Sequence, residues 1–451
     1  MSIVIGKQLF ASHEWHTIEA RYFSGKAEAD YIAVEQSLEL QGEVPLVGAK
    51  NAVLVIMASL ILAEGKSVLK NVPCSADVIQ MVSLLEELGA EVIFYPELNV
   101  LEVDTSFIRT FQVPAAIMKK MRASVLVMGP LLARFGRADI ALPGGCLIGA
   151  RPIDYHLKNF AKMGVQLEVE GEYLRAHVSH LKAATLVLDY PSVGATENLL
   201  MLAALVPGTT RIINAALEPE VNDLISILRS MGARITVHAP ATIEIEGVSQ
   251  LRPVEHTVIP DRLEAGSLLL AAAIAGGSIN LPQAVAPDME VFLLKLQEMG
   301  HHIQVGKGGI GISLVATRHP QAVSFRTSPY PGFPTDLQAP MMAALCLAQG
   351  KSEVHETVYE NRFLHVRELQ KMGAQIAVNG DRALITGVEE LYGTSVIASD
   401  IRASCALVVA GLAAKGSTMI TGIHHWRRGY QALEKKLVTL GAKIALMSSG
   451  E

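Results

Sequence analysis

Six copies of one short pattern run through the chain, and they constrain its fold more than any other feature. Each copy is an amphipathic helix ending in Leu or Met, then a glycine, then an alternating strand, as in EELGAEVIF and QKMGAQIAV. A glycine ends such a helix because it adopts the left-handed conformation without a Cβ penalty. Successive copies are 68 to 75 residues apart, which predicts six structural units. The glycines are Gly89, Gly164, Gly232, Gly300, Gly373 and Gly441.

A second glycine stands 23 to 28 residues before each of these and closes a different kind of helix. These stretches, such as NAVLVIMASLILAEG, are apolar nearly all round and rich in Ala and Gly, which indicates full burial. Units of about 70 residues are longer than ordinary solenoid repeats. We therefore predict an α/β fold of two similar domains, each of three repeats with buried helices surrounded by sheets. The second glycines are Gly65, Gly136, Gly208, Gly277, Gly350 and Gly416.

The composition excludes several classes of protein. Half of the 451 residues are hydrophobic, but the longest apolar runs, 52–63 and 268–275, are too short to span a membrane. The chain has 38 Lys and Arg against 44 Asp and Glu, and this net charge of −6 gives no excess of basic residues for binding nucleic acid. Four scattered cysteines argue against a disulfide framework or a zinc site, and 14 histidines lack metal-ligand spacing. No secretory signal is evident at the N-terminus, so we expect a cytoplasmic protein without a metal.

Polar residues gather where the buried helices and the loops before the amphipathic helices begin. Asp, Ser and Thr in such places are explained by capping. Capping does not explain cations in such places, because a helix N-terminus already carries about half a positive charge. An added Arg there costs up to about 1 kcal/mol. Repetition in one register favours a bound polyanion over a set of solvated surface cations. The cations are Lys50, Arg122, Arg151, Arg362, Arg402 and Arg428.

The loop LPGGCLIGARP, residues 142–152, is the most specific local signal. Its glycines allow close approach to a ligand, and Cys146 near Arg151 suits an acid or a nucleophile, although an isolated Cys is often inert. Cys346 and Cys405 lie in apolar runs and are predicted to be core residues. Asp336 is either a helix cap or a general base.

The histidine pairs give weaker expectations. His301 and His302 are expected on a strand surface. His424 and His425 are expected in a loop, either solvated or lining a site. The sequence GKGGIG, residues 306–311, lacks the Walker spacing and is predicted to be a hairpin turn.

Together the motifs resemble the family of UDP-N-acetylglucosamine 1-carboxyvinyltransferases, enolpyruvyl transferases of peptidoglycan synthesis. The resemblance runs from about residue 31 to the C-terminus. It is carried by GAKN, MRAS, LPGGCLIGARP, SVGAT, PDR, FPTD, ENRF, SDIRAS and RGY, with Asp154 and His156. It implies an inside-out α/β barrel in each of two domains, residues 50–260 with repeats 1–3 and residues 31–49 plus 261–451 with repeats 4–6. Residues 1–30 lie outside it.

The resemblance also implies the site. Cys146, Asp336, Lys50 and Arg428 would be catalytic. Phosphoenolpyruvate would be held by Lys50, Asn51, Arg151, Arg362, Arg402 and Arg428, with Arg362 and Arg402 on its carboxylate. UDP-N-acetylglucosamine would meet Arg122, Arg151, Pro152, Ile153, Asp154, Tyr155, Tyr190, Pro191, Ser192, Val193, Asp336 and Val358. Tyr190 and Pro191 depart from the family, which commonly has a lysine before this serine.

The implied reaction needs no metal or organic cofactor, and its partners are the two small-molecule substrates. Cys146 would protonate the methylene carbon of phosphoenolpyruvate, Asp336 would accept the proton of the 3′-hydroxyl, and phosphate would leave from a tetrahedral ketal. Two alternatives stay open: an enolpyruvyl transferase with another acceptor, and a noncatalytic repeat scaffold. The scaffold gives no reason for the cations or for a cysteine among glycines.

Overall fold

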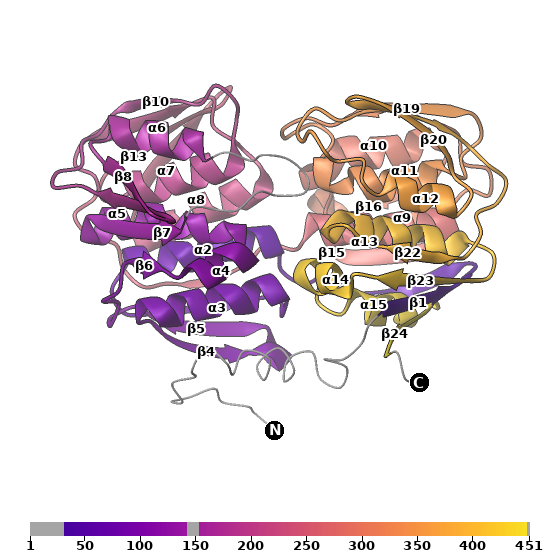
Figure 1. The fold of residues 1–451 in the computed structure, drawn as a ribbon, viewed down its shortest axis with the longest axis horizontal. Helices are drawn as coiled ribbons and strands as arrows, with labels where there is room; N and C mark the ends of the chain where they lie inside the picture. Colours follow the sequence, from indigo (N-terminus) through magenta and orange to yellow (C-terminus); the bar gives the residue numbers. More distant parts are fainter. Residues whose placement is uncertain (1–30, 142–152, 449–451) are drawn as a thin grey trace. The chain divides into compact units, whose positions relative to one another are not determined.

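The structure is a computed structural model that describes residues 31–141 and 153–448. The described chain divides into two compact units, one of residues 48–141 and 153–259 and the other of residues 31–47 and 260–448. The N-terminal extension and the loop with Cys146 lie outside the described residues. Within each unit the sheets lie outside and the apolar helices inside, an inside-out α/β barrel (Figure 1).

Each unit carries three four-stranded sheets with one shared topology. In every sheet one edge strand is parallel to its neighbour, and the other neighbouring strands are antiparallel. The sheets of the first unit are β14(Glu255–Thr257)-β3(Lys66–Lys70)-β5(Val100–Asp104)-β4(Glu91–Tyr95), β6(Gln112–Val113)-β7(Arg137–Ala141)-β9(Tyr173–His177)-β8(Gln166–Glu170) and β10(Thr185–Val187)-β11(Thr209–Ile213)-β13(Thr242–Glu246)-β12(Arg234–His238). Those of the second unit are β16(His302–Val305)-β17(Ile310–Val315)-β15(Gly277–Val285)-β2(Leu40–Glu43), β18(Phe325–Arg326)-β19(Lys351–His355)-β21(Arg382–Thr386)-β20(Gln375–Asn379) and β22(Ser395–Ile397)-β23(Ser417–Thr421)-β1(Tyr31–Glu35)-β24(Lys443–Met447). One arrangement repeated six times confirms the predicted repeat.

The helices follow the predicted alternation between buried and amphipathic. In the first unit they are α2(Lys50–Ser59), α3(Ala76–Leu88), α4(Ala115–Lys120), α5(Met128–Phe135), α6(Asp154–Lys162), α7(Val193–Ala203) and α8(Pro219–Met231). In the second unit they are α9(Arg262–Ala275), α10(Glu290–Glu298), α11(Gln338–Leu345), α12(Val366–Lys371), α13(Ile401–Ala413), α14(Ile423–Gly429) and α15(Leu433–Thr439). Short 3-10 helices are η1(Leu60–Leu62), η2(Pro96–Leu98), η3(Arg122–Val127), η4(Ala286–Met289), η5(Lys307–Gly309) and η6(Thr335–Leu337). All twelve marker glycines have positive φ, between 69° and 118°, as the pattern requires.

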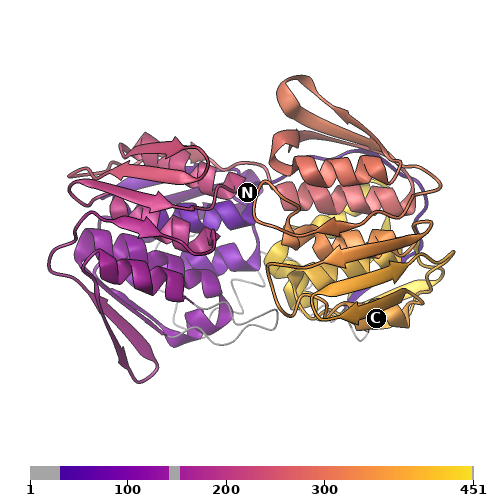
Figure 2. The ribbon, with the colours of Figure 1, turned by 90° about the horizontal axis from the view of Figure 1, so that it is seen from above.

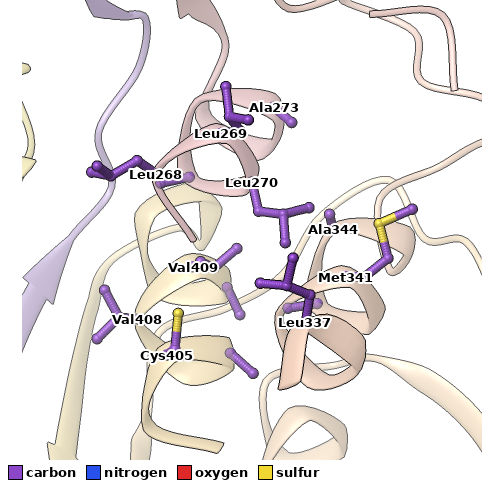
Figure 3. Packing of buried hydrophobic residues seen from close by; sticks show 14 of the residues in the cluster. Leu268, Leu269, Leu270, Ala273, Leu337, Met341, Ala344, Cys405, Val408 and Val409 are labelled. Atoms are coloured by element: carbon purple, nitrogen blue, oxygen red, sulfur yellow. The ribbon is translucent and has the colours of Figure 1, made fainter. Parts of the chain in front are cut away.

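The core of the second unit lies between three buried helices, α9, α11 and α13, which pack on one another. Leu270, Leu337 and Val409 converge between them (Figure 3). A Cβ on Gly266 would come within 2.5 Å of Leu337 Cδ1, so the missing side chain allows the close approach of α9. Strands lie outside these helices in a second view as well (Figure 2). Many of the hydrophobic residues are thus buried in helices. No helix in the described part is long and apolar enough to cross a membrane.

Two of the six buried helices begin with a 3-10 turn, which the sequence pattern did not distinguish. Helix η3 leads into α5, and η6 leads into α11. Pro130 and Pro340 each occupy the third position of the α-helix that follows. Proline is tolerated in a first turn because the N–H that it lacks has no partner inside the helix there. These prolines thus mark where both α-helices start, and Asp336 lies in the 3-10 turn before α11.

Two local expectations were wrong. His424 and His425 lie in the short helix α14 rather than in a loop. The chain turns only after this helix, at Ala432, whose φ is 48°. His301 is buried, with 3% of its surface exposed, while His302 is exposed as expected. The reason is a contact with a distant residue: His301 Nδ1 accepts a hydrogen bond from the backbone N of Thr317 at 3.2 Å, which holds the ring inside.

Buried His301 should make the stability of the protein depend on pH. Burial lowers the pKa of this imidazole from 6.5 to about 4. Its contribution to stability is therefore complete above pH 6.5 and is lost as the pH falls toward 4, by up to about 3 kcal/mol. We expect His301→Asn, which keeps an acceptor for Thr317, to flatten that part of the profile in urea titrations between pH 4 and 7. The exposed His302→Asn is the control, and an unchanged profile for His301→Asn would refute the assignment.

Candidate active site

Asp336 in the second unit lies between two buried arginines. Arg362 Nη2 donates to Asp336 Oδ1 at 2.6 Å, and Arg402 Nη2 donates to Oδ2 at 2.8 Å. The Arg362 and Arg402 side chains are 3% and 7% exposed, and Asp336 is 25% exposed. Chain segments 26 and 66 residues away from Asp336 thus supply its partners. One carboxylate facing two guanidinium groups leaves positive charge for a bound anion.

The helix starts near Asp336 differ in how they are capped. Ser192, Asp261 and Asp400 cap α7, α9 and α13 with their side chains. Helix α11 and the 3-10 turn before it have no side-chain cap. Asp336 is thus not the N-cap residue of either element, and its carboxylate is paired with Arg362 and Arg402.

The electrostatics around the arginines follow from burial and close opposite charge. Burial alone would lower the pKa of Arg402, but the facing carboxylate of Asp336 raises it well above its ordinary value. Burial would raise the pKa of Asp400, yet Arg362 and the first N–H groups of α13 hold it below its ordinary value. Burial lowers the pKa of His365 to about 4, so this ring is neutral near pH 7. Arg402 thus stays charged.

One donor of Arg362 is left over for a ligand. Its Nε is buried and has no hydrogen-bond partner in the part of the chain that the structure describes. A buried guanidinium N–H without a partner costs free energy unless something else accepts its hydrogen bond. This donor belongs to the cation that the family resemblance placed on a substrate carboxylate.

Val358 is tied to the Asp336 cluster through one buried acid. Glu356 Oε1 accepts from the backbone N of Val358 at 2.8 Å, and Glu356 Oε2 accepts from Thr335 Oγ1 at 3.0 Å. Arg428 lies half-buried in α14, and its charge contributes to lowering the pKa of His425 to about 4, after burial and His424. Arg362 and Arg402 are thus bonded to Asp336 directly, and Val358 is connected through Glu356 to Thr335, which precedes Asp336.

In the first unit Lys50 opens helix α2 and pairs with an acid that the sequence reasoning missed. Lys50 Nζ lies 3.3 Å from Asp77 Oδ2, with the two side chains 11% and 6% exposed. Asp77 lies in the first turn of α3, and Ala49 offers α2 no side-chain cap. Asn51 follows Lys50 in α2 and is half-buried. An uncapped helix start with a buried lysine is suited to an anion.

The sugar-nucleotide candidates of this unit lie at two neighbouring helix starts. Helix α6 begins at Asp154, directly after Ile153, and helix α7 begins at Val193, after its cap Ser192. The two starts are held together because His156 Nδ1 lies 3.1 Å from Asn198 Nδ2 and its ring meets Gly194. Half-buried side chains at these starts are Ile153, Tyr155, Tyr190, Pro191, Ser192 and Val193.

Asn198 is the buried polar residue that joins these helices, and its removal should destabilise the protein. Its Oδ1 accepts from Gly129 N at 2.7 Å, and its Nδ2 donates to Val125 O at 2.9 Å. Asn198→Ala would leave these groups and His156 unsatisfied in the core, and we expect the free energy of unfolding to fall by about 3 kcal/mol. Urea titration measures it. The control is Asn222→Ala, which alters one exposed hydrogen bond; an equal, small loss for both variants would contradict the prediction.

The remaining candidates fall outside what the structure describes. Cys146, Arg151 and Pro152 are in the undescribed loop, and the Arg122 side chain is not described, although Arg122 begins η3. Two residues that contact candidates were not assigned a role from sequence, Asp77 and Tyr430. Asp77 could have been noticed as an acid in a first helical turn, and Tyr430 as part of the RGY motif. No group of three or more possible metal ligands occurs among the described side chains.

The chain is similar to a family of known proteins over most of its length. The family model for EPSP synthase (3-phosphoshikimate 1-carboxyvinyltransferase) matches residues 34–437. A UDP-N-acetylglucosamine 1-carboxyvinyltransferase of Dichelobacter nodosus is 48% identical over 90% of this chain and 96% of its own. One of Saccharophagus degradans is 46% identical over 92% of this chain and 99% of its own.

Solved structures share the fold. The enolpyruvyl transferase NikO from Streptomyces tendae has a TM-score of 0.84 at 25% identity, covering 92% of this chain and 98% of its own. EPSP synthase from Acinetobacter baumannii has a TM-score of 0.73 at 16% identity, covering 92% of this chain and 99% of its own, and shows the fold alone. The chain therefore belongs to the EPSP synthase family and, within it, to the UDP-N-acetylglucosamine 1-carboxyvinyltransferases.

Proposed function

We propose that this chain transfers the enolpyruvyl group of phosphoenolpyruvate to the 3′-hydroxyl of UDP-N-acetylglucosamine and releases phosphate, the first committed step of peptidoglycan precursor synthesis. The observation that carries the proposal is the carboxylate of Asp336 between two buried arginines, in a chain nearly half identical to proteins of that name. A base beside an anion site is what this reaction requires, since the acceptor hydroxyl loses a proton next to a multiply charged donor.

The roles divide by charge. Arg362 and Arg402 would bind the carboxylate of phosphoenolpyruvate, and Arg362 Nε would then gain the acceptor that it lacks among the described residues. Lys50, Arg151 and Arg428 would bind its phosphate, and Asn51 would adjoin them. The first-unit helix starts, with Arg122, Arg151, Pro152, Ile153, Asp154, Tyr155, Tyr190, Pro191, Ser192 and Val193, would bind the sugar nucleotide, together with Asp336 and Val358.

The proposed chemistry is an addition followed by an elimination. Cys146 gives a proton to the methylene carbon of phosphoenolpyruvate, and the 3′-oxygen bonds to the neighbouring carbon as Asp336 takes the hydroxyl proton. The product of this step is a tetrahedral ketal that still carries phosphate. A proton then leaves the methyl group as the carbon–oxygen bond to phosphate breaks, which restores the double bond. The cations stabilise the charge that moves onto the phosphate.

Two wider assignments belong to the same proposal. The predicted domains, residues 50–260 and residues 31–49 with 261–451, would be the two catalytic domains, each a three-repeat barrel. The reaction would take place in the cytoplasm. In support, Cys74, Cys346 and Cys405 are free thiols, as a reducing compartment favours.

Phosphate release tests the acceptor directly. Purified protein is incubated with phosphoenolpyruvate alone, with UDP-N-acetylglucosamine, or with 3-phosphoshikimate, and inorganic phosphate is measured. We expect release only with the nucleotide sugar. Release that depends on 3-phosphoshikimate would assign the chain another acceptor, and no release with either from folded protein would overturn the proposal.

A further inference from the structure

Arg402 is held on the side away from Asp336 by a buried tyrosine. Its Nη1 donates to Tyr430 Oη at 3.1 Å, while its Nη2 donates to Asp336 at 2.8 Å. Tyr430 is 4% exposed, and its ring lies against the ring of Trp426 with centroids 5.1 Å apart. The guanidinium therefore has one contact to the proposed base and one to a neutral phenol. Of these two partners, only Asp336 changes its charge during the proposed reaction.

The hydroxyl groups of Tyr430 and Ser267 lie behind Arg402, next to the thiol of Cys405. Ser267 Oγ donates to Leu263 O at 2.7 Å, and it lies 3.2 Å from Tyr430 Oη. Because an arginine only donates, Tyr430 accepts from Arg402 and has its own proton to give to Ser267 Oγ or to the Cys405 thiol. The contacts connect Arg402 through Tyr430 and Ser267 to Leu263 O. Ser267 is 2% exposed, so water does not compete for these bonds.

The chain of hydrogen bonds ends on a rigid part of the second unit. Leu263 lies in the first turn of α9, where Asp261 Oδ1 accepts from Leu263 N at 2.7 Å. The same turn binds residue Val47 twice: Asp261 N donates to Val47 O at 2.9 Å, and Glu264 Oε2 accepts from Val47 N at 3.1 Å. Glu264 is in turn paired with Lys436 at 2.7 Å. A first turn fixed by so many bonds is a firm anchor.

We propose that Tyr430 and Ser267 are positioning residues that hold the Arg402 guanidinium in place while Asp336 gains a proton. The proposal rests on the proposed function. When Asp336 becomes neutral, its ion pairs with both arginines weaken. The position of Arg402 is then set by its hydrogen bond to Tyr430. Tyr430 stays neutral, because burial raises the pKa of its hydroxyl well above the ordinary value. The bond from Arg402 to Tyr430 is therefore the one that persists through the step.

Tyr430→Phe removes the single oxygen and keeps the ring that packs on Trp426. We expect the KM for phosphoenolpyruvate to rise about tenfold, the effect of one hydrogen bond to a charged group, while the KM for UDP-N-acetylglucosamine changes little. Ser267→Ala should also raise the KM for phosphoenolpyruvate. The double variant should be no worse than Tyr430→Phe, because both residues act along one path. Tyr392→Phe, an exposed tyrosine bonded to Glu390, is the matched control.

Direct binding separates this inference from the proposed function. Phosphoenolpyruvate is titrated calorimetrically into wild type and Tyr430→Phe, with UDP-N-acetylglucosamine present. Weaker binding to the variant at an unchanged thermal midpoint supports the positioning role, whether or not wild type turns over. Equal binding and equal KM in a folded variant, or losses that simply add in the double variant, would overturn it. Wild type that binds both compounds without releasing phosphate would refute the proposed function alone.

Discussion

Asp336→Asn is expected to lower kcat by about 10³-fold, the usual contribution of a general base. The amide has nearly the same size as the carboxylate but takes no proton from the acceptor hydroxyl. It also leaves Arg362 and Arg402 facing each other without the charge between them, since each now donates to one carboxylate oxygen at 2.6 Å and 2.8 Å. Initial rates of phosphate release measure the effect.

Asp381→Asn is the matched control for this substitution. Asp381 is also in the second unit and bonds a histidine, with Oδ2 2.8 Å from His355 Nε2, but its side chain is 63% exposed. We expect its kcat to stay at the wild-type value. If Asp336→Asn keeps kcat within a few-fold of wild type while folded, Asp336 is a structural partner of the arginines and another group removes the proton.

Cys146→Ser should lose most of the activity, and Cys146 should be the one thiol that reacts in the native protein. The three described cysteines are poor nucleophiles, because burial raises the pKa of Cys74 and of Cys346 to about 12 and also raises that of Cys405. At pH 8 a thiol of pKa 12 is ionised in roughly one molecule in ten thousand. We therefore expect one alkylated residue in native protein and four after denaturation.

Mass spectrometry of tryptic peptides locates the adduct. We expect fosfomycin to label wild type and Cys346→Ala but not Cys146→Ser. An adduct on Cys74, Cys346 or Cys405 of the native protein would contradict the assignment. Full activity of Cys146→Ser would remove Cys146 from the proton transfer.

The fold could be predicted from the sequence because its signals are local. A helix, a glycine at positive φ and an alternating strand occupy about ten consecutive residues, and six copies reinforce one another. The entry turns of α5 and α11 were missed because a proline in a first turn is compatible with both helix types. His301 was misplaced because its partner Thr317 is 16 residues away, beyond any local pattern.

The sequence predicts the candidate site as a set of residues, but it does not predict the contacts among them. Asp261, Asp336 and Asp400 look alike in sequence, each before an apolar helix, and the structure makes two of them caps and pairs the third with arginines. The network behind Arg402 joins Tyr430 to Ser267 across 163 residues. No periodicity carries such information, because it depends on how the buried helices pack.

The identity of the product tests the central claim most directly. Protein, phosphoenolpyruvate and UDP-N-acetylglucosamine are incubated together, and the nucleotide sugar is analysed by liquid chromatography and mass spectrometry. The account predicts a product heavier than UDP-N-acetylglucosamine by one enolpyruvyl group, formed in equal amount to the phosphate released and absent with Asp336→Asn. Unmodified nucleotide sugar after complete consumption of phosphoenolpyruvate would contradict it.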